Sequence, residues 1–118
     1  MEISVYVDGS GGKQSGYGFY TKETGESLYE KKPGITNNQA EYMAIIAALK
    51  RYAGSKEKIT ILSDSKNTVY QLNHEYAINS PPLRLLAQVA WGLSTSFSDL
   101  TITWIPRGQN LAGKMMGS

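Results

Sequence analysis

The sequence contains no cysteine and only one histidine, His74, among its 118 residues. The missing cysteines exclude a disulfide scaffold, a thiolate zinc site and a thiol nucleophile, and they fit a reducing compartment. No apolar run approaches the roughly 20 residues that a transmembrane helix needs. The first residues, Met1-Glu2-Ile3, lack the charged and then apolar layout of a secretory signal. We therefore expect a cytoplasmic protein without a membrane segment.

The sequence also lacks a large excess of charge of either sign. It has 12 lysines and arginines and 10 aspartates and glutamates, which gives a net charge of +2. Such a small excess does not identify a polyanionic partner, although it would not repel one. The hydrophobic share of 41% argues against a disordered chain. With no repeat, low-complexity tract or linker, residues 1–118 are expected to form one domain with a single core, and we expect a monomer.

Apolar runs separated by glycine and proline predict an α/β protein. Three early strands joined by short glycine-containing turns predict an antiparallel meander. A helical crossover then leads to a fourth strand, which favours parallel pairing with the first. The expected sheet is therefore five-stranded and mixed, flanked by helices. The predicted elements are strands 3–7, 17–21 and 27–31, a helix from Thr36 to about Gly54, strand 58–63, helices 66–73 and 83–97, strand 100–105 and a short helix 111–116.

The long helix has a strong start signal. Thr36 and Gln39 stand in the Thr-x-x-Gln relation of a capping box. Nearly every residue from 42 to 49 is apolar, and a helix that is apolar all round packs on more than one side. This helix is therefore expected to lie centrally on the sheet.

Two predicted strands end in an aspartate. The first leads into Asp8-Gly9-Ser10 and the fourth into Asp64-Ser65. If these strands are parallel neighbours, both aspartates emerge at their carboxyl ends, where open α/β sheets bind ligands. Burying such a charge is costly unless a cation or a hydrogen-bond donor meets it. Glu41, in the first two turns of the long helix, is placed to aim a third carboxylate at this edge.

Three oxygen donors without sulfur or a histidine cluster suit Mg²⁺ or Mn²⁺ better than Zn²⁺. Magnesium usually keeps several waters and completes its shell with substrate phosphates. The pattern therefore indicates phosphoryl transfer or phosphodiester hydrolysis. Each carboxylate also has an ordinary structural explanation: a turn at Asp8, a helix cap at Asp64, and a helix-dipole contact at Glu41.

Four blocks in this order resemble the signature of type 1 ribonuclease H, and together they cover nearly the whole chain. They are Val-Asp-Gly-Ser at 7–10, Thr-Asn-Asn-Gln-Ala-Glu at 36–41, Leu-Ser-Asp-Ser at 62–65, and Trp-Ile-Pro-Arg at 104–107 followed by Asn110-Leu-Ala112. Each block alone is a weak signal, but four in sequence with suitable elements between them are a strong one.

The resemblance implies a ribonuclease H-like fold and an endonuclease that cuts the RNA strand of RNA–DNA hybrids. Two Mg²⁺ or Mn²⁺ ions would act with substrate bound, leaving 5′-phosphate and 3′-hydroxyl ends. Asp8 would bridge both ions, while Glu41 and Asp64 would each bind one. Amides suit contact with 2′-hydroxyls and base edges, because they both donate and accept. The nucleic-acid contacts implied are Gly9, Ser10, Asn37, Asn38, Gln39 and Ser65.

The sequence departs from the family pattern near its end. The family carries a fourth carboxylate at the start of the last helix, but here Gly113 follows Ala112. Asn110 is the nearby residue that could supply a neutral amide oxygen to a metal. The family's mobile histidine has no clear match, and the basic helix-and-loop handle of some members is missing. We therefore expect weaker metal or substrate binding than in a four-carboxylate enzyme.

Two alternatives stay open. One is a non-catalytic or weakly active hybrid-binding module that kept the fold after losing the fourth ligand. The other is a different nuclease or strand-transfer enzyme of the same fold, which the block at 36–41 does not favour. Both tryptophans, Trp91 and Trp104, lie in apolar periodic segments and are predicted to belong to the core.

Overall fold

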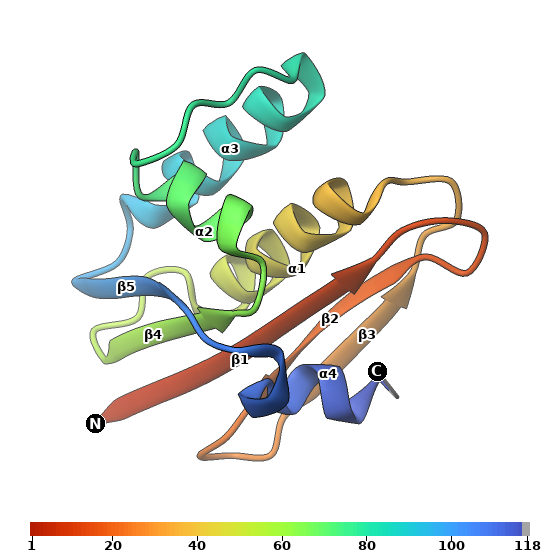
Figure 1. Ribbon diagram of the computed structural model, residues 1–118. Helices are drawn as coiled ribbons and strands as arrows, with labels where there is room; N and C mark the ends of the chain where they lie inside the picture. The colour runs from red at the N-terminus through yellow and green to blue at the C-terminus, as the bar shows by residue number, and fades with distance from the viewer. Residues whose placement is uncertain (117–118) are drawn as a thin grey trace.

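Five strands form one mixed sheet in the order β3-β2-β1-β4-β5 in the computed structural model, which describes residues 1–116 (Figure 1). No helix in this part of the chain combines the length and apolar character needed to cross a bilayer. The elements are β1 (Glu2–Ser10), β2 (Gly16–Thr21), β3 (Ser27–Lys31), α1 (Asn37–Tyr52), β4 (Lys58–Ser63), α2 (Lys66–Leu72), α3 (Pro81–Ser94), β5 (Asp99–Trp104), the 3₁₀ turn η1 (Arg107–Gln109) and α4 (Leu111–Met115).

The strand pairing follows from the connections. Short turns join β1, β2 and β3, and these strands pair antiparallel. Longer crossovers lead to β4 and β5, which extend the sheet in parallel from β1. The predicted five-stranded mixed α/β sheet is therefore confirmed, including the parallel pairing of the first and fourth strands.

The central helix α1 organises the core. Its Tyr42, Ile45 and Leu49 side chains are fully buried, and the helix packs against both the sheet and α3. The capping box is present: the Thr36 hydroxyl accepts from the Gln39 N–H at 3.1 Å, and the Gln39 amide oxygen accepts from the Thr36 N–H at 2.9 Å. Helix α4 contacts β1 and β2, and Figure 1 shows it in front of the sheet, away from α1, α2 and α3.

Several predicted element boundaries and one burial prediction were wrong. The first strand continues past Val7 to Ser10, because β2 still offers antiparallel partners up to Gly16. The helix α3 begins at Pro81 instead of residue 83, since proline is tolerated in the first turn of a helix, and it ends at Ser94. Trp104 is 39% exposed and is not a core residue.

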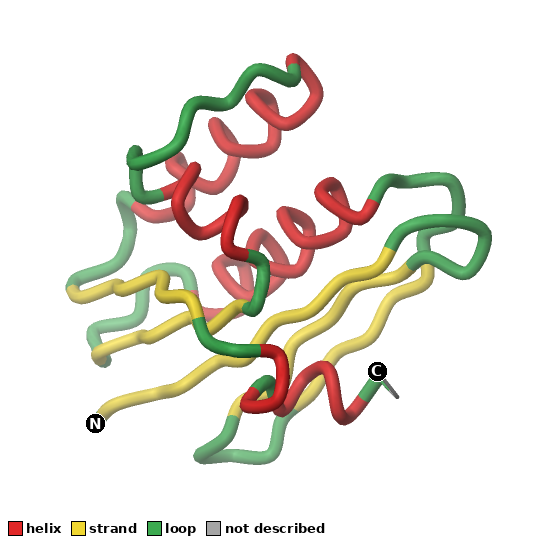
Figure 2. Tube along the Cα trace, viewed as in Figure 1, coloured by secondary structure: helices red, strands yellow, loops and turns green. Residues whose placement is uncertain are grey.

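The two loops at one end of the sheet lie together (Figure 2). One joins β1 to β2 and the other joins β3 to α1. The Gly12 N–H donates to the Ile35 carbonyl at 3.0 Å, and the Gly34 N–H donates to the Gly12 carbonyl at 3.2 Å. These bonds fix the start of α1 against the end of β1.

Helix α1 approaches β1 most closely at Gly9. A Cβ atom there would lie 2.4 Å from both the carbonyl carbon and the oxygen of Ala40. No side chain can occupy that space unless the helix moves away from the strand. Glycine at this position therefore sets the distance between the two elements.

Replacing Gly9 by alanine is expected to lower the free energy of unfolding by about 1–3 kcal/mol, because the added methyl group overpacks this contact. Urea unfolding measures the change. Gly92→Ala is the matched control, since a Cβ at Gly92 meets nothing within 4 Å and alanine is favoured inside a helix. Equal effects of the two substitutions would contradict the close approach.

Candidate metal centre

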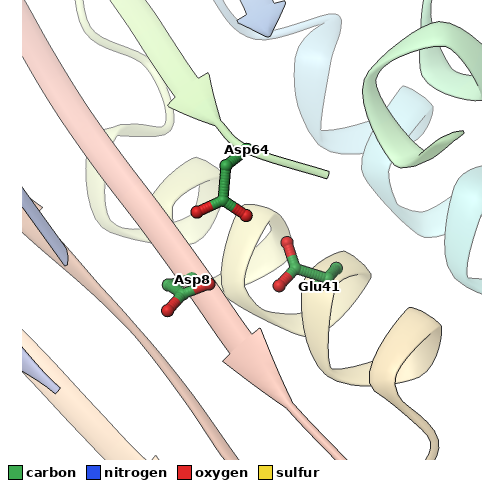
Figure 3. Close-up of side chains that lie close together, drawn as sticks. All are labelled: Asp8, Glu41 and Asp64. Carbon is green, nitrogen blue, oxygen red and sulfur yellow. The ribbon is translucent and has the colours of Figure 1, made fainter. Parts of the chain in front are cut away.

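The strand register brings Asp8 and Asp64 together. The parallel ladder between β1 and β4 ends at the pair Val7–Ser63, so the next residue on each strand is an aspartate. Beyond that point β4 has ended, while β1 continues along β2 with Asp8 opposite Gly18. The two carboxylates therefore lie beside one another at the point where β4 ends and β1 continues (Figure 3).

Glu41 reaches the same place from the second turn of α1. Its side chain is only 7% exposed. The Gly9 N–H donates to Glu41 Oε1 at 3.0 Å, and the Ser63 hydroxyl donates to Glu41 Oε2 at 3.4 Å. One donor comes from each of the two strands, so the glutamate is held between β1 and β4.

The three carboxylates form a tight group of like charges. One oxygen from each of Asp8, Glu41 and Asp64 lies within 4.8 Å of the others. Burial raises the pKa of Glu41 to about 9, repulsion from Asp8 and then Asp64 adds to the shift, and the Gly9 hydrogen bond opposes it. Such a cluster is unfavourable when all its members are ionised.

The donor set fits a divalent cation. All three groups offer hard oxygen ligands, which suit Mg²⁺ or Mn²⁺. A bound cation would favour the ionised form of Glu41, because it adds opposite charge where burial and repulsion now disfavour that form. The predicted ligands Asp8, Glu41 and Asp64 are thus close enough to share a metal site.

The residues expected to contact nucleic acid each lie within four positions of one of the three carboxylates in sequence. Ser10 is exposed at the end of β1, and Asn38 is exposed in the first turn of α1. The Asn37 amide oxygen accepts from the Gly11 N–H, and the Gln39 amide oxygen belongs to the capping box. In both amides the bond within the protein uses the oxygen, so the NH₂ group is the part that can donate to a substrate.

Ser65 and Gly9 have structural contacts as well. Ser65 occupies the N-cap position of α2, but its hydroxyl bonds to the Thr68 hydroxyl at 2.8 Å instead of to a helix N–H. Gly9 supplies its N–H to Glu41. Their roles toward a substrate stay predictions.

The final helix reaches the cluster through Asn110. This residue is fully buried and is the N-cap of α4. Its amide nitrogen lies 2.9 Å from Asp64 Oδ2. Gly113 is also buried, in the first turn of α4, and brings no side chain to the site. Between α2 and α3 lie only residues 73–80, so no basic helix is inserted there.

Sequence reasoning missed one residue beside the carboxylate cluster, Trp104. The Trp104 indole N–H donates to the Asp64 carbonyl oxygen at 3.2 Å. The Lys66 ammonium lies 5.8 Å from the centre of the Trp104 ring and 5.6 Å from that of Tyr70. The position of Trp104 at the carboxyl end of β5, in register with Ser63 of β4, was the signal that could have placed it here.

Comparison with known proteins identifies relatives of this chain. The protein named "Putative hydrolase EbsB" from Enterococcus faecalis is 28% identical and covers 97% of this chain and 90% of its own length. Ribonuclease HI from Halobacterium salinarum is 38% identical over 97 residues, 81% of this chain. That alignment takes in 47% of the archaeal protein, so the chain spans about half of its length.

The structural match extends over almost the whole chain. The crystal structure of RNase H1 from Halobacterium salinarum superimposes with a TM-score of 0.86 and 32% identity, covering 98% of this chain and 93% of the archaeal one. The family model described as RNase H matches residues 1–104. The structural superposition and the sequence match together lead to one conclusion: the chain belongs to the RNase H family.

Proposed function

We propose that this protein is a metal-dependent endonuclease that hydrolyses the RNA strand of RNA–DNA hybrids. The observation that carries the proposal is the convergence of Asp8, Glu41 and Asp64 within 4.8 Å at the edge of the sheet. A purely structural explanation would have to account for three carboxylates gathered at one mostly buried place. Family membership favours hybrid as the substrate among the possible phosphodiesters.

The three carboxylates would hold two Mg²⁺ or Mn²⁺ ions, with Asp8 shared between them. When bound, such ions activate the attacking water and stabilise the leaving 3′ oxygen, which gives 5′-phosphate and 3′-hydroxyl ends. The protein itself orients the ligands. The Gly9 N–H and the Ser63 hydroxyl hold Glu41, and Asn110 contacts Asp64.

Side-chain amides support the choice of an RNA-containing duplex. Asn37, Asn38 and Gln39 form the first turn of α1, and Glu41 follows one turn later. An amide can donate to a 2′-hydroxyl or to a base edge in the minor groove. The 2′-hydroxyl is the group that distinguishes RNA from DNA. This turn is therefore proposed to select the strand that is cut.

Gly113→Asp tests whether the missing fourth carboxylate limits activity. The substitution is expected to raise hybrid cleavage at low Mg²⁺ by about tenfold, because a further negative charge near Asp64 strengthens cation binding. Rates measured across a Mg²⁺ titration show the effect, with Lys114→Asp as a charge-change control at an exposed position. No gain in a folded Gly113→Asp protein would mean that another group fills this role.

A substrate panel tests the proposal itself. Labelled RNA–DNA hybrid, duplex RNA and duplex DNA are incubated with the protein in Mg²⁺, in Mn²⁺ and in chelator. Cleavage of the RNA strand of the hybrid alone, and only with metal, is the expected result. Saturable hybrid binding without cleavage in either metal would instead favour the non-catalytic binding module, for which the missing carboxylate at Gly113 is the supporting observation. Cleavage of DNA would favour another nuclease of this fold.

A further inference from the structure

The Asn110 side chain makes four hydrogen bonds in a fully buried position. Its amide nitrogen donates to the Val7 carbonyl oxygen at 2.9 Å and to Asp64 Oδ2 at 2.9 Å. Its amide oxygen accepts from the backbone N–H groups of Ala112 at 3.0 Å and Gly113 at 3.4 Å. One side chain thus joins β1, the end of β4 and the start of α4.

These partners fix which end of the amide faces the cluster. Two backbone N–H groups at the start of α4 require an acceptor, and the Val7 carbonyl and the Asp64 carboxylate require a donor. A reversed amide would place its NH₂ against two donors and its oxygen against two acceptors, so all four bonds would be lost. The group that faces Asp64 is therefore the NH₂, which has no lone pair available for a cation.

We infer that Asn110 is a positioning residue that holds the Asp64 carboxylate in the metal centre, instead of being a ligand itself. This inference rests on the proposed function, because it assumes that Asp64 binds a cation. Because this bond goes to Oδ2, the other oxygen of Asp64, Oδ1, is the one that we propose for the metal.

Without this bond, two features would let the Asp64 side chain rotate away from the other carboxylates. It lies one residue beyond the end of β4, so strand pairing no longer restrains it. Asp8 lies close by with like charge, and so does Glu41 once it is ionised. A donor behind Asp64 opposes that repulsion and lowers the rotamer entropy lost when a cation binds. In this chain α4 therefore contributes to the centre through an amide, although it lacks the fourth carboxylate.

Metal affinity without nucleic acid tests the inference. Isothermal titration with Mn²⁺ compares the wild type, Asn110→Ser and Asn73→Ser. Serine is also a good N-cap, so the first variant keeps the cap of α4 but loses the contact with Asp64. Asn73→Ser is the matched control, because the Asn73 amide donates to a backbone carbonyl, that of Ile102, at 2.8 Å. We expect Asn110→Ser to bind Mn²⁺ about tenfold more weakly or worse, and Asn73→Ser to bind it as the wild type does.

The outcomes separate the two hypotheses. If the wild type does not bind Mn²⁺, the proposed function fails. If the wild type binds and Asn110→Ser binds equally well, only the positioning role is overturned. Should Asn110→Ser not fold, side-chain amide resonances in ¹⁵N-labelled protein decide: the Asn110 NH₂ signal is expected to shift in Asp64→Asn. An unchanged signal would overturn the inference.

Discussion

Asp8→Asn is expected to slow cleavage of RNA–DNA hybrid roughly a thousandfold. Asparagine keeps the shape of the side chain but removes the negative charge that the two ions are proposed to share. Metal ions supply several kcal/mol of charge stabilisation in such reactions, and each 1.4 kcal/mol corresponds to about tenfold in rate. Single-turnover cleavage at saturating Mg²⁺ measures the loss directly.

The same variant should not be less stable than the wild type. Removing one charge from the cluster of Asp8, Glu41 and Asp64 reduces repulsion, so the free energy of unfolding in chelator is expected to stay level or rise. Asp99→Asn, at the exposed start of β5, is the control for a lost aspartate charge away from the site. Wild-type turnover by Asp8→Asn would defeat the mechanism.

The second large effect concerns stability and pH. Burial and the neighbouring aspartates raise the pKa of Glu41 from 4.5 to about 9. Between these values the folded protein holds a proton that the unfolded chain has released, so metal-free stability falls as pH rises through this window. One such proton changes stability by up to about 1.4 kcal/mol for each pH unit, and we expect a total loss of about 2–4 kcal/mol.

Urea unfolding at pH 5, 7 and 9 in chelator measures this dependence. Glu41→Gln should remove most of the slope and stabilise the metal-free protein at high pH, because the neutral amide does not have to ionise. Glu75→Gln, at an exposed position, should leave the slope as it is. Saturating Mg²⁺ should also flatten the slope of the wild type, since the ion binds the ionised cluster of the folded state. Equal slopes for the wild type and Glu41→Gln would show that Glu41 does not titrate in this window.

Much of the fold and the core of the site could be predicted because they follow from local patterns. Asp8 and Asp64 each follow an apolar run, and parallel pairing of those runs is enough to set them side by side. Glu41 could be placed because the capping box at Thr36 and Gln39 fixes where α1 begins. From there the turn of the helix that carries Glu41 is determined.

The rest depended on contacts between distant segments. The extension of β1 to Ser10 depends on how far β2 continues, which the sequence of β1 does not contain. Trp104 looked like a core residue because its strand is apolar, but β5 is an edge strand and leaves the ring partly exposed. The orientation of the Asn110 amide is set by partners up to 103 residues away in sequence, so no local pattern could reveal it.

Anomalous diffraction from crystals soaked in Mn²⁺ shows directly whether the three carboxylates bind a metal. We predict a manganese peak bonded to carboxylate oxygens of Asp8, Glu41 and Asp64, at a Mn²⁺ concentration that also supports hybrid cleavage. A peak elsewhere, or no peak at these three residues under conditions where the protein cleaves hybrid, would contradict it.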